Sequence, residues 1–471
     1  MSHFNIILKD NEVPKYIQIQ LHIKKLIDLN RLKDGEKLPP IRELSESLGV
    51  NKSTVINSYK KLEEEGYIVQ KIGSGTFVKK KDGFKNIKRQ YSEMFKKINS
   101  DMLKSYIDFT GETTNSTFFP VNVFKEVIND VLERDGVNAL VYQELLGYEG
   151  LRKSIVGNFW GNSVSAEDVL IVSGAQQGLD IISKALLGSR DCVVMEKPTY
   201  SGALAVFNWK RAEIHEIDIE EDGINTTELE NILKRNKVKF LYVMSYFQNP
   251  TGITYSREKK LEILRLADIY DFYIIEDDYL SELIYNPEIR YESFKSMDTG
   301  NRVIYIKSFS KIFLPGIRIG YVLAPPKFKE AIQNAKINSD ISTSSLMQRA
   351  LELYINTGYW RNHIANLNDI YIVRYSFMLE LLRKYLGDLA HFKAPGGGFN
   401  FYLKLRGDII IDSFDLFNRC RRSKVLITPG AMFYRNVEDG RRCFRIGFSQ
   451  TDEKDIEEGL KKIRKIILGS D

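Results

Sequence analysis

The feature that most restricts the fold is a series of short apolar runs, each followed by a glycine or polar loop. The runs are VLIV, CVVM, FLYVM, FYII and VIYI, which begin at residues 169, 192, 240, 272 and 303. Apolar runs without polar alternation indicate strands buried on both faces. Helical patterns such as residues 257–269 lie between them. This alternation predicts an α/β domain with a mostly parallel sheet over residues 107–471.

Three polar motifs follow these runs, at the strand ends where α/β sheets bind ligands. Ser173-Gly174-Ala175-Gln176 lies between a strand and a helix, where backbone N–H groups favour a phosphate. Asn249, in Asn-Pro-Thr-Gly, can present its amide to a ring oxygen. Asp277 ends a strand, with Tyr279 two residues further on. A buried carboxylate needs a partner, and a protonated pyridine nitrogen is a suitable one.

A fourth motif, SFSKIFLPGIR, places Lys311 after Ser308 and Ser310 and before Arg318. A lysine can form a Schiff base with an aldehyde, and serine hydroxyls with an arginine suit a phosphate monoester. Taken singly, each motif can be structural, since Asn-Pro-Thr-Gly is an ordinary turn and Asp-Asp-Tyr can cap a helix. The ordered set predicts a site for pyridoxal 5′-phosphate (PLP).

The first eighty residues have a different pattern. Ile17, Leu21 and Ile23 begin a run with nearly helical spacing, and GEKLPP then breaks the chain. A short helix is expected to end at Gly49. A third helix is expected to begin after Asn51, and two short strands follow around Gly73-Ser74-Gly75. Helix, short helix, turn, helix and hairpin is the order of a winged helix-turn-helix, which we assign to residues 1–80.

The start of the third helix is the expected DNA-reading surface. Lys52, Ser53 and Thr54 lie there, opposite the apolar Val55 and Tyr59. When such a helix enters a major groove, its first residues meet base edges and phosphates. The alternative is a helical module for protein contacts.

Charge is unevenly distributed along the chain. Residues 1–104 hold 21 Lys and Arg against 13 Asp and Glu, whereas the remaining residues hold 47 against 49. The asymmetry points to a polyanionic partner for the N-terminal part, although chance solvation of an exposed region would give the same count. Residues 81–106 are lysine-rich and weakly periodic, which predicts a basic linker.

Several classes of protein are not indicated. The sequence has no apolar run near the ~18–20 residues of a membrane span, and no signal-peptide layout, so we expect a cytoplasmic protein without a membrane partner. The cysteines Cys192, Cys420 and Cys443 form no CxxC pair. They suggest neither a zinc site nor a disulfide framework, and no metal is expected.

The stretch LPPIRELSESLGVNKSTVINSYKKLEEEGYIVQKIGSGTFV resembles the DNA-binding domain of the GntR family of bacterial regulators. The resemblance implies that Arg42, Lys52 and Thr54 contact DNA and that Gly73 lies in the wing. Lys52 and Ile56 stand where many members use arginine. Lysine neutralises phosphate but cannot fork onto guanine, so part of the base readout is expected elsewhere.

Residues 107–468 resemble the fold-type I aminotransferases. The resemblance implies that Lys311 carries the internal aldimine and that Asp277 holds the pyridine nitrogen. It implies that Asn249 and Tyr279 contact the phenolic oxygen, and that Tyr200 stacks on the ring. The residues implied to hold the phosphate are Gly174, Ala175, Gln176, Ser308, Ser310 and Arg318, with Tyr142 reaching the phosphate of a partner subunit.

Arg445, in CFRIGFS, matches the arginine that binds a substrate α-carboxylate in these enzymes. The alternative is a structural ion pair. Two departures put inherited substrate preference in doubt. Lys307 stands where relatives often have glycine, and Asn400 stands where they often have histidine.

A GntR-like domain followed by an aminotransferase-like domain is similar to the MocR subfamily of regulators. The resemblance implies a head-to-tail homodimer that binds operator DNA and responds to PLP or to an amino compound through aldimine exchange at Lys311. A true aminotransferase with an accessory DNA-binding domain is the alternative. The retained residues fit both, because aldimine exchange uses the same groups as the first step of transamination.

Overall fold

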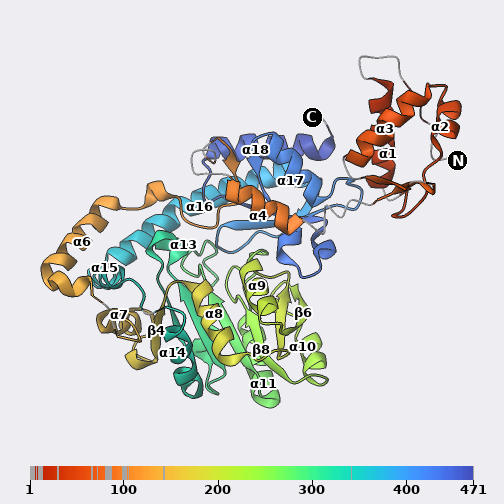
Figure 1. The fold of residues 1–471 in the computed structure, drawn as a ribbon. Coiled ribbons are helices and arrows are strands. Elements are labelled where there is room, and N and C mark those ends of the chain that lie inside the picture. The colour runs from red at the N-terminus through yellow and green to blue at the C-terminus, as the bar shows by residue number, and fades with distance from the viewer. Residues whose placement is uncertain are drawn as a thin grey trace. The chain divides into compact units, whose positions relative to one another are not determined.

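The computed structural model describes residues 6, 8, 14–28, 31–64, 67–71, 73–79, 87–97, 103, 105–141, 144–313, 315–340 and 342–469. The chain divides into two compact units, Met1–Ser92 and Glu93–Asp471, and each is described by itself. Figure 1 labels helices of both units and some strands of the larger one. Helix α4 (Ile87–Lys97) lies in the part of the sequence that joins them.

The N-terminal unit is the expected winged helix-turn-helix. Its elements are α1 (Lys15–Asp28), α2 (Ile41–Leu48), α3 (Lys52–Glu64), β1 (Ile68–Lys71) and β2 (Gly75–Val78). The two strands pair antiparallel, with Ile68 opposite Val78. Gly49 ends α2 in the left-handed conformation at φ +60°, which a residue without Cβ adopts readily.

One hydrophobic core holds the N-terminal unit together. Its buried side chains are Ile19, Ile23, Leu26, Ile27, Leu32, Leu38, Leu44, Val55, Tyr59, Leu62, Ile68 and Val78. The Tyr59 hydroxyl donates to the Pro39 carbonyl at 2.8 Å. Leu21, which we expected on the apolar side of α1, is 53% exposed. The stripe that faces the core begins at Ile19 instead and recurs at helical spacing.

The large unit is built on an eight-stranded sheet in the order β4-β11-β10-β9-β8-β5-β6-β7. The strands are β4 (Val169–Val172), β5 (Cys192–Lys197), β6 (Glu213–Glu220), β7 (Gly223–Ile224), β8 (Val238–Val243), β9 (Tyr273–Asp278), β10 (Val303–Ser308) and β11 (Gly320–Leu323). The five apolar runs all form strands of this sheet, and β4, β9, β10 and β11 are buried throughout.

Strand direction brings the loops of this sheet together. Strands β6, β5, β8, β9 and β10 are mutually parallel. Strand β11 runs antiparallel to both β10 and β4, so β4 has the direction of the parallel strands. Gly320 lies opposite both Ser308 and Val172. The carboxyl ends of β4 and β10 therefore reach the same edge.

Helices make up much of the rest of the large unit (Figure 1). They are α6 (Val121–Asp135), α7 (Glu149–Phe159), α8 (Ala175–Leu186), α9 (Ser201–Trp209), α10 (Thr226–Leu233), α11 (Arg257–Tyr270), α12 (Phe294–Met297), α13 (Ser310–Phe313), α14 (Lys329–Ile337), α15 (Ser345–Asn356), α16 (Tyr359–Leu386), α17 (Ser413–Arg422) and α18 (Glu453–Leu468). Helices α10 and α11 pack on β5, β8 and β9 in one apolar cluster.

A second, antiparallel sheet of order β12-β13-β16-β15 completes the unit. Its strands are β12 (Ala390–Phe392), β13 (Asn400–Leu405), β15 (Thr428–Pro429) and β16 (Cys443–Gly447). A separate parallel pair joins β3 (Ile107–Asp108) to β14 (Val425–Leu426). The start of the large unit is thereby held beside the segment that leads into β15.

Within the described ranges, no helix combines the length and the apolar character needed to cross a bilayer.

Candidate functional site

The four predicted motifs lie at one edge of the large sheet. Asp277 is in β9 and Ser308 ends β10, while Asn249 lies in the loop after β8 and Lys311 in α13. The turn at Gly174 follows β4 and leads into α8. Because these strands share one direction, their carboxyl ends meet, and the four motifs, spread over residues 173–318, form one site.

A group of hydrogen-bond donors lies between the start of α8 and Arg318. Gly174 has φ +91°, and a Cβ there would lie 3.1 Å from Arg318 Nη2. The Arg318 guanidinium donates to the Ser173 carbonyl at 2.7 Å. Ser310 Oγ is buried without a hydrogen-bond partner among the described residues. The first N–H groups of α8, a guanidinium and a free hydroxyl make a donor set suited to a phosphate.

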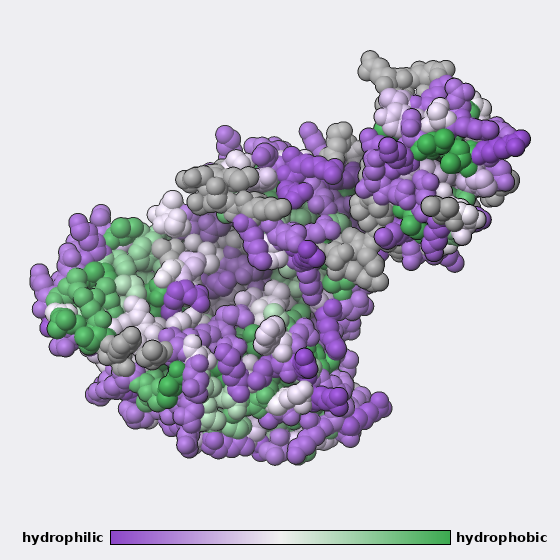
Figure 2. Space-filling model, in the orientation of Figure 1, coloured by the Kyte–Doolittle hydropathy of each residue, from purple (hydrophilic) through white to green (hydrophobic). Residues whose placement is uncertain are grey.

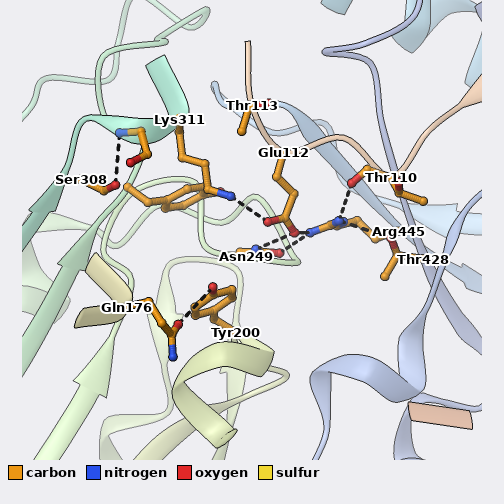
Figure 3. A network of polar contacts seen from close by, with 12 residues as sticks. Thr110, Glu112, Thr113, Gln176, Tyr200, Asn249, Ser308, Lys311, Thr428 and Arg445 are labelled. Atoms are coloured by element: carbon orange, nitrogen blue, oxygen red, sulfur yellow. Dashed lines mark hydrogen bonds and ion pairs between the residues drawn. The ribbon is translucent and has the colours of Figure 1, made fainter. Parts of the chain in front are cut away.

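Tyr200 and Gln176 lie side by side at this edge (Figure 3). The Tyr200 hydroxyl donates to Gln176 Oε1 at 3.4 Å, and Gln176 Nε2 donates to the Gly202 carbonyl at 3.3 Å. Burial raises the pKa of Tyr200 well above its usual value, so the phenol stays neutral. A neutral aromatic ring in this place can stack on a flat ligand.

Asp277 carries an unsatisfied acceptor. The carboxylate is 3% exposed, and its Oδ2 accepts from the Tyr242 hydroxyl at 2.7 Å. Its Oδ1 is buried with no partner among the residues the structure describes. Burial raises the pKa of Asp277 from 3.8 to about 6, despite the Tyr242 hydrogen bond. A ligand N–H at Oδ1 would satisfy this group and return the pKa toward its usual range.

The structure gives Asn249 and Tyr279 protein partners. The Tyr279 hydroxyl donates to the Phe247 carbonyl at 2.6 Å. Asn249 is 1% exposed and lies between two charged groups. Its amide donates to Glu112 Oε1 at 3.2 Å, and its Oδ1 accepts from Arg445 Nη1 at 2.8 Å.

Glu112 is a residue of this site that the sequence reasoning missed. Its carboxylate lies between Lys311 and Arg445 (Figure 3). Oε2 is 3.0 Å from Lys311 Nζ, and Oε1 accepts from Arg445 Nη1. The one available signal was that Glu112 is the only charged residue between Asp108 and Lys125. Nothing in its spacing connects it with Lys311 and Arg445, which lie 199 and 333 positions further along the chain.

Lys307 and Asn400, the two residues that differ from those of many relatives, have different surroundings. The Lys307 ammonium is bound by Asp278 at 2.9 Å and by Glu282 at 2.8 Å. Since adjacent strand residues face opposite sides of the sheet, Lys307 and Asp278 point away from Asp277. Asn400 is buried at the start of β13, and its Oδ1 has no partner among the described residues. Tyr142, the expected phosphate contact from a partner subunit, lies outside the described residues.

The residues expected to contact DNA lie on the surface of the N-terminal unit. Lys52 and Ser53 are exposed in the first turn of α3, and Thr54 is half-buried. Arg42, in α2, pairs with Glu46 at 3.0 Å, and its side chain is 78% exposed. Gly73 is exposed at the hairpin tip with φ +78°. Because the Arg42–Glu46 pair is exposed, exchanging it for a contact between Arg42 and a DNA phosphate costs little free energy.

Comparisons with known proteins agree with both units. Residues 110–463 match the family described as aminotransferase class I and II, and residues 15–78 match the gntR family of bacterial regulatory proteins. The two matches define a DNA-binding regulator joined to an aminotransferase-type domain. The chain belongs to the aminotransferase class I and II family, and its gntR-type N-terminal unit places it in the MocR subfamily of regulators.

Individual relatives are of two kinds. The HTH-type transcriptional regulator YdfD of Bacillus subtilis is 28% identical, over 98% of this chain and 97% of its own length. Aromatic-amino-acid aminotransferase 1 of Thermococcus litoralis is 31% identical over 77% of this chain and 88% of its own. The solved kynurenine aminotransferase of Pyrococcus horikoshii superposes with a TM-score of 0.74 at 30% identity, covering 82% of this chain and 98% of that protein.

The residues present fit PLP, the cofactor of this family. The unpartnered Asp277 Oδ1 suits a pyridinium N–H, and the unpartnered Ser310 Oγ suits a phosphate oxygen. The Lys311 amine is the group that an aldehyde requires. When bound, PLP supplies an electrophilic carbon and an electron-withdrawing ring.

The buried charge of Asp277 has a measurable effect on stability. Above pH 6 this carboxylate is ionised in the folded, cofactor-free chain, whereas below pH 4 it is protonated in both states. We expect Asp277→Asn to raise the free energy of unfolding of the cofactor-free protein by roughly 2–3 kcal/mol at pH 8. This increase in the free energy of unfolding should become smaller as the pH falls from 6 to 4. Denaturant titrations at several pH values measure it.

The exposed Asp369→Asn in α16 is the matched control, and it should change stability by less than about 0.5 kcal/mol at every pH. Equal effects of the two substitutions would contradict an unpaired charge at Asp277.

Proposed function

We propose that this protein is a PLP-dependent transcription regulator, which binds operator DNA through its N-terminal unit and senses an amino compound or PLP itself at Lys311. The observation that carries the proposal is an intact PLP-type site in a chain that matches regulators over nearly its full length. NorG of Staphylococcus aureus, named an HTH-type transcriptional regulator, is 29% identical over 91% of this chain and 98% of its own. We place its action in the cytoplasm, where operator DNA is found.

In this proposal each residue at the sheet edge has one role. Lys311 holds the cofactor aldehyde covalently, and Asp277 pairs with the ring nitrogen. Asn249 and Tyr279 hold the phenolic oxygen, and Tyr200 stacks on the ring. The phosphate is held by Gly174, Ala175, Gln176, Ser308, Ser310 and Arg318, with a contribution from Tyr142 of a second copy.

Sensing follows from ligand exchange at Lys311. An amino compound that replaces the lysine nitrogen on the cofactor frees the Lys311 amine, which lies 3.0 Å from Glu112. The ligand shifts the regulator between two states only by its differential affinity for them. The second candidate function is a working aminotransferase, which the likeness to named aminotransferases favours. Steady turnover of an amino donor at ordinary enzymatic rates, roughly 1–10³ per second, would support it.

An apolar surface supports the proposed homodimer. Exposed large hydrophobic side chains gather on and just after α6, and they are Val121, Leu132, Val137, Leu140 and Leu145. Figure 2 shows hydrophobic surface over the region where Figure 1 labels α6. Contiguous exposed apolar patches mark interaction sites. We propose that two copies associate here, in the head-to-tail arrangement of the subfamily.

The covalent role of Lys311 is tested by Lys311→Ala. We expect the variant to lose the visible absorbance band of the cofactor-bound protein and to lose any response of DNA binding to amino compounds. Absorbance titration with PLP and a gel-shift assay measure the two effects. Lys184→Ala, an exposed change in α8, should retain both. Persistence of the covalent band in the Lys311 variant would refute the assignment.

The DNA-reading role of Lys52 is tested by Lys52→Ala. Loss of one phosphate contact should weaken binding to the region upstream of the protein's own gene and lower the salt slope of log K by about one. Fluorescence anisotropy over a range of salt concentrations measures both quantities. Lys153→Ala in α7 of the large unit is the control. An unchanged slope in the Lys52 variant would exclude this contact.

The proposed dimer surface is tested by Leu140→Glu. A charge in the centre of a buried apolar interface should shift the protein toward monomer by more than about tenfold in the dissociation constant. Sedimentation velocity over a concentration series measures this shift. Ile410→Glu is a matched control, because Ile410 is 71% exposed and Leu140 is 66% exposed. Equal behaviour of the two variants would exclude the α6 surface.

A further inference from the structure

Glu112 bridges two cationic side chains of the candidate site, Lys311 and Arg445. One carboxylate oxygen is 3.0 Å from Lys311 Nζ, and the other accepts from Arg445 Nη1. Figure 3 shows the carboxylate between the two side chains, with Asn249 beside it. The place next to a guanidinium and the reactive lysine is the place a ligand's α-carboxylate would need. In this chain a side-chain carboxylate of the protein already fills it.

The guanidinium of Arg445 has little donor capacity left for a ligand. Nη1 donates to Glu112 and to Asn249 Oδ1, the latter at 2.8 Å. Nη2 donates to the Thr110 carbonyl at 3.1 Å and to Thr428 Oγ1 at 3.3 Å. Of the three guanidinium nitrogens of Arg445, only Nε has no hydrogen-bond partner among the described residues. Bidentate recognition of a carboxylate needs two adjacent N–H groups, so a ligand would have to displace Glu112 or the Thr110 and Thr428 contacts.

The charge balance also opposes a second carboxylate. The Arg445 side chain is 2% exposed and that of Glu112 is 22% exposed, so water screens the pair poorly. Burial alone would raise the pKa of Glu112. Arg445 and Lys311 outweigh that effect and hold the pKa well below its usual range. Glu112 is therefore an anion at any physiological pH, and a ligand carboxylate beside Arg445 would meet a like charge.

We propose that Glu112 takes the place of a ligand carboxylate, and that the compound sensed at Lys311 is a primary amine without an α-carboxylate. The inference rests on the proposed function, because it assumes that Lys311 holds PLP. The ammonium of such an amine is attracted by Glu112, and nothing in it competes for Arg445. In the exchange, the amine nitrogen forms one C=N bond as the lysine nitrogen loses one. The released Lys311 amine takes up the proton that the incoming ammonium loses.

This assignment changes the role of Arg445. From the sequence, two roles were open for it, binding of a ligand carboxylate or a structural ion pair. In our inference Arg445 is a positioning residue, which holds Glu112 and Asn249 in place. Glu112 is then the residue that determines specificity.

The experiment compares amino acids with the amines that differ from them only by the α-carboxylate. The pairs are phenylalanine with phenylethylamine, and lysine with cadaverine, titrated into the full-length, PLP-loaded protein. Isothermal titration calorimetry gives the dissociation constants, and absorbance follows the exchange at Lys311. We expect the wild-type protein to bind at least one amine more than about tenfold more tightly than its amino acid.

Glu112→Gln separates specificity from folding. It keeps the shape of the side chain and removes the charge, so the amine-to-acid preference should fall by about tenfold or more. Glu149→Gln, an exposed change in α7, should leave the preference unaltered. Thermal melting and PLP affinity of the Glu112 variant serve as checks that the site is intact.

The outcomes distinguish the inference from the proposed function. If the wild-type protein binds neither PLP nor DNA, or only one of them, the proposed function is contradicted. If both bind, three results overturn only the role of Glu112. These are amino acids binding as tightly as their amines, a preference unchanged in Glu112→Gln, and no binding of either member of any pair.

Discussion

The site depends on one geometric constraint, the common direction of the central strands. Parallel strands β8, β9 and β10, together with β4, end at the same edge of the sheet. Each contributes a different group there, and the groups are an amide, a carboxylate, a lysine and a glycine turn. The apolar runs of these strands are buried on both faces, so helices must cover them. Polar side chains can then gather only where the strands end.

At this edge of the sheet, three charged side chains are in contact. Arg445 and Lys311 are cations in a place where water screens weakly, and Glu112 is the anion between them. Asp277 is the opposite case, because one of its oxygens lacks a partner within the described part of the chain. A satisfied pair and an unsatisfied carboxylate thus lie at one edge of the sheet. In our proposal the first limits which ligands bind, and the second favours a cofactor with a ring N–H.

Much of the fold could be predicted because its signals are local. The five apolar runs gave the strands, and the Gly49 turn gave the end of α2. Prediction failed where contacts with residues distant in sequence determine which way a side chain faces. Leu21 fits a helical stripe in sequence, yet the helices that pack on α1 select the face that begins at Ile19. Lys307 is a departure from the family pattern beside the site motif, and strand alternation turns it toward Asp278 and Glu282.

The sequence by itself determined the two-unit architecture, the PLP-type motif set and the reading helix of the DNA-binding unit, because each is encoded in residues close together in the chain. Only the tertiary structure decided what surrounds Arg445. Glu112 reaches it because β3 pairs with β14 and holds the start of the large unit beside the strand that follows. No local pattern records a contact across 333 positions, so the carboxylate beside Arg445 could be found only in the folded chain.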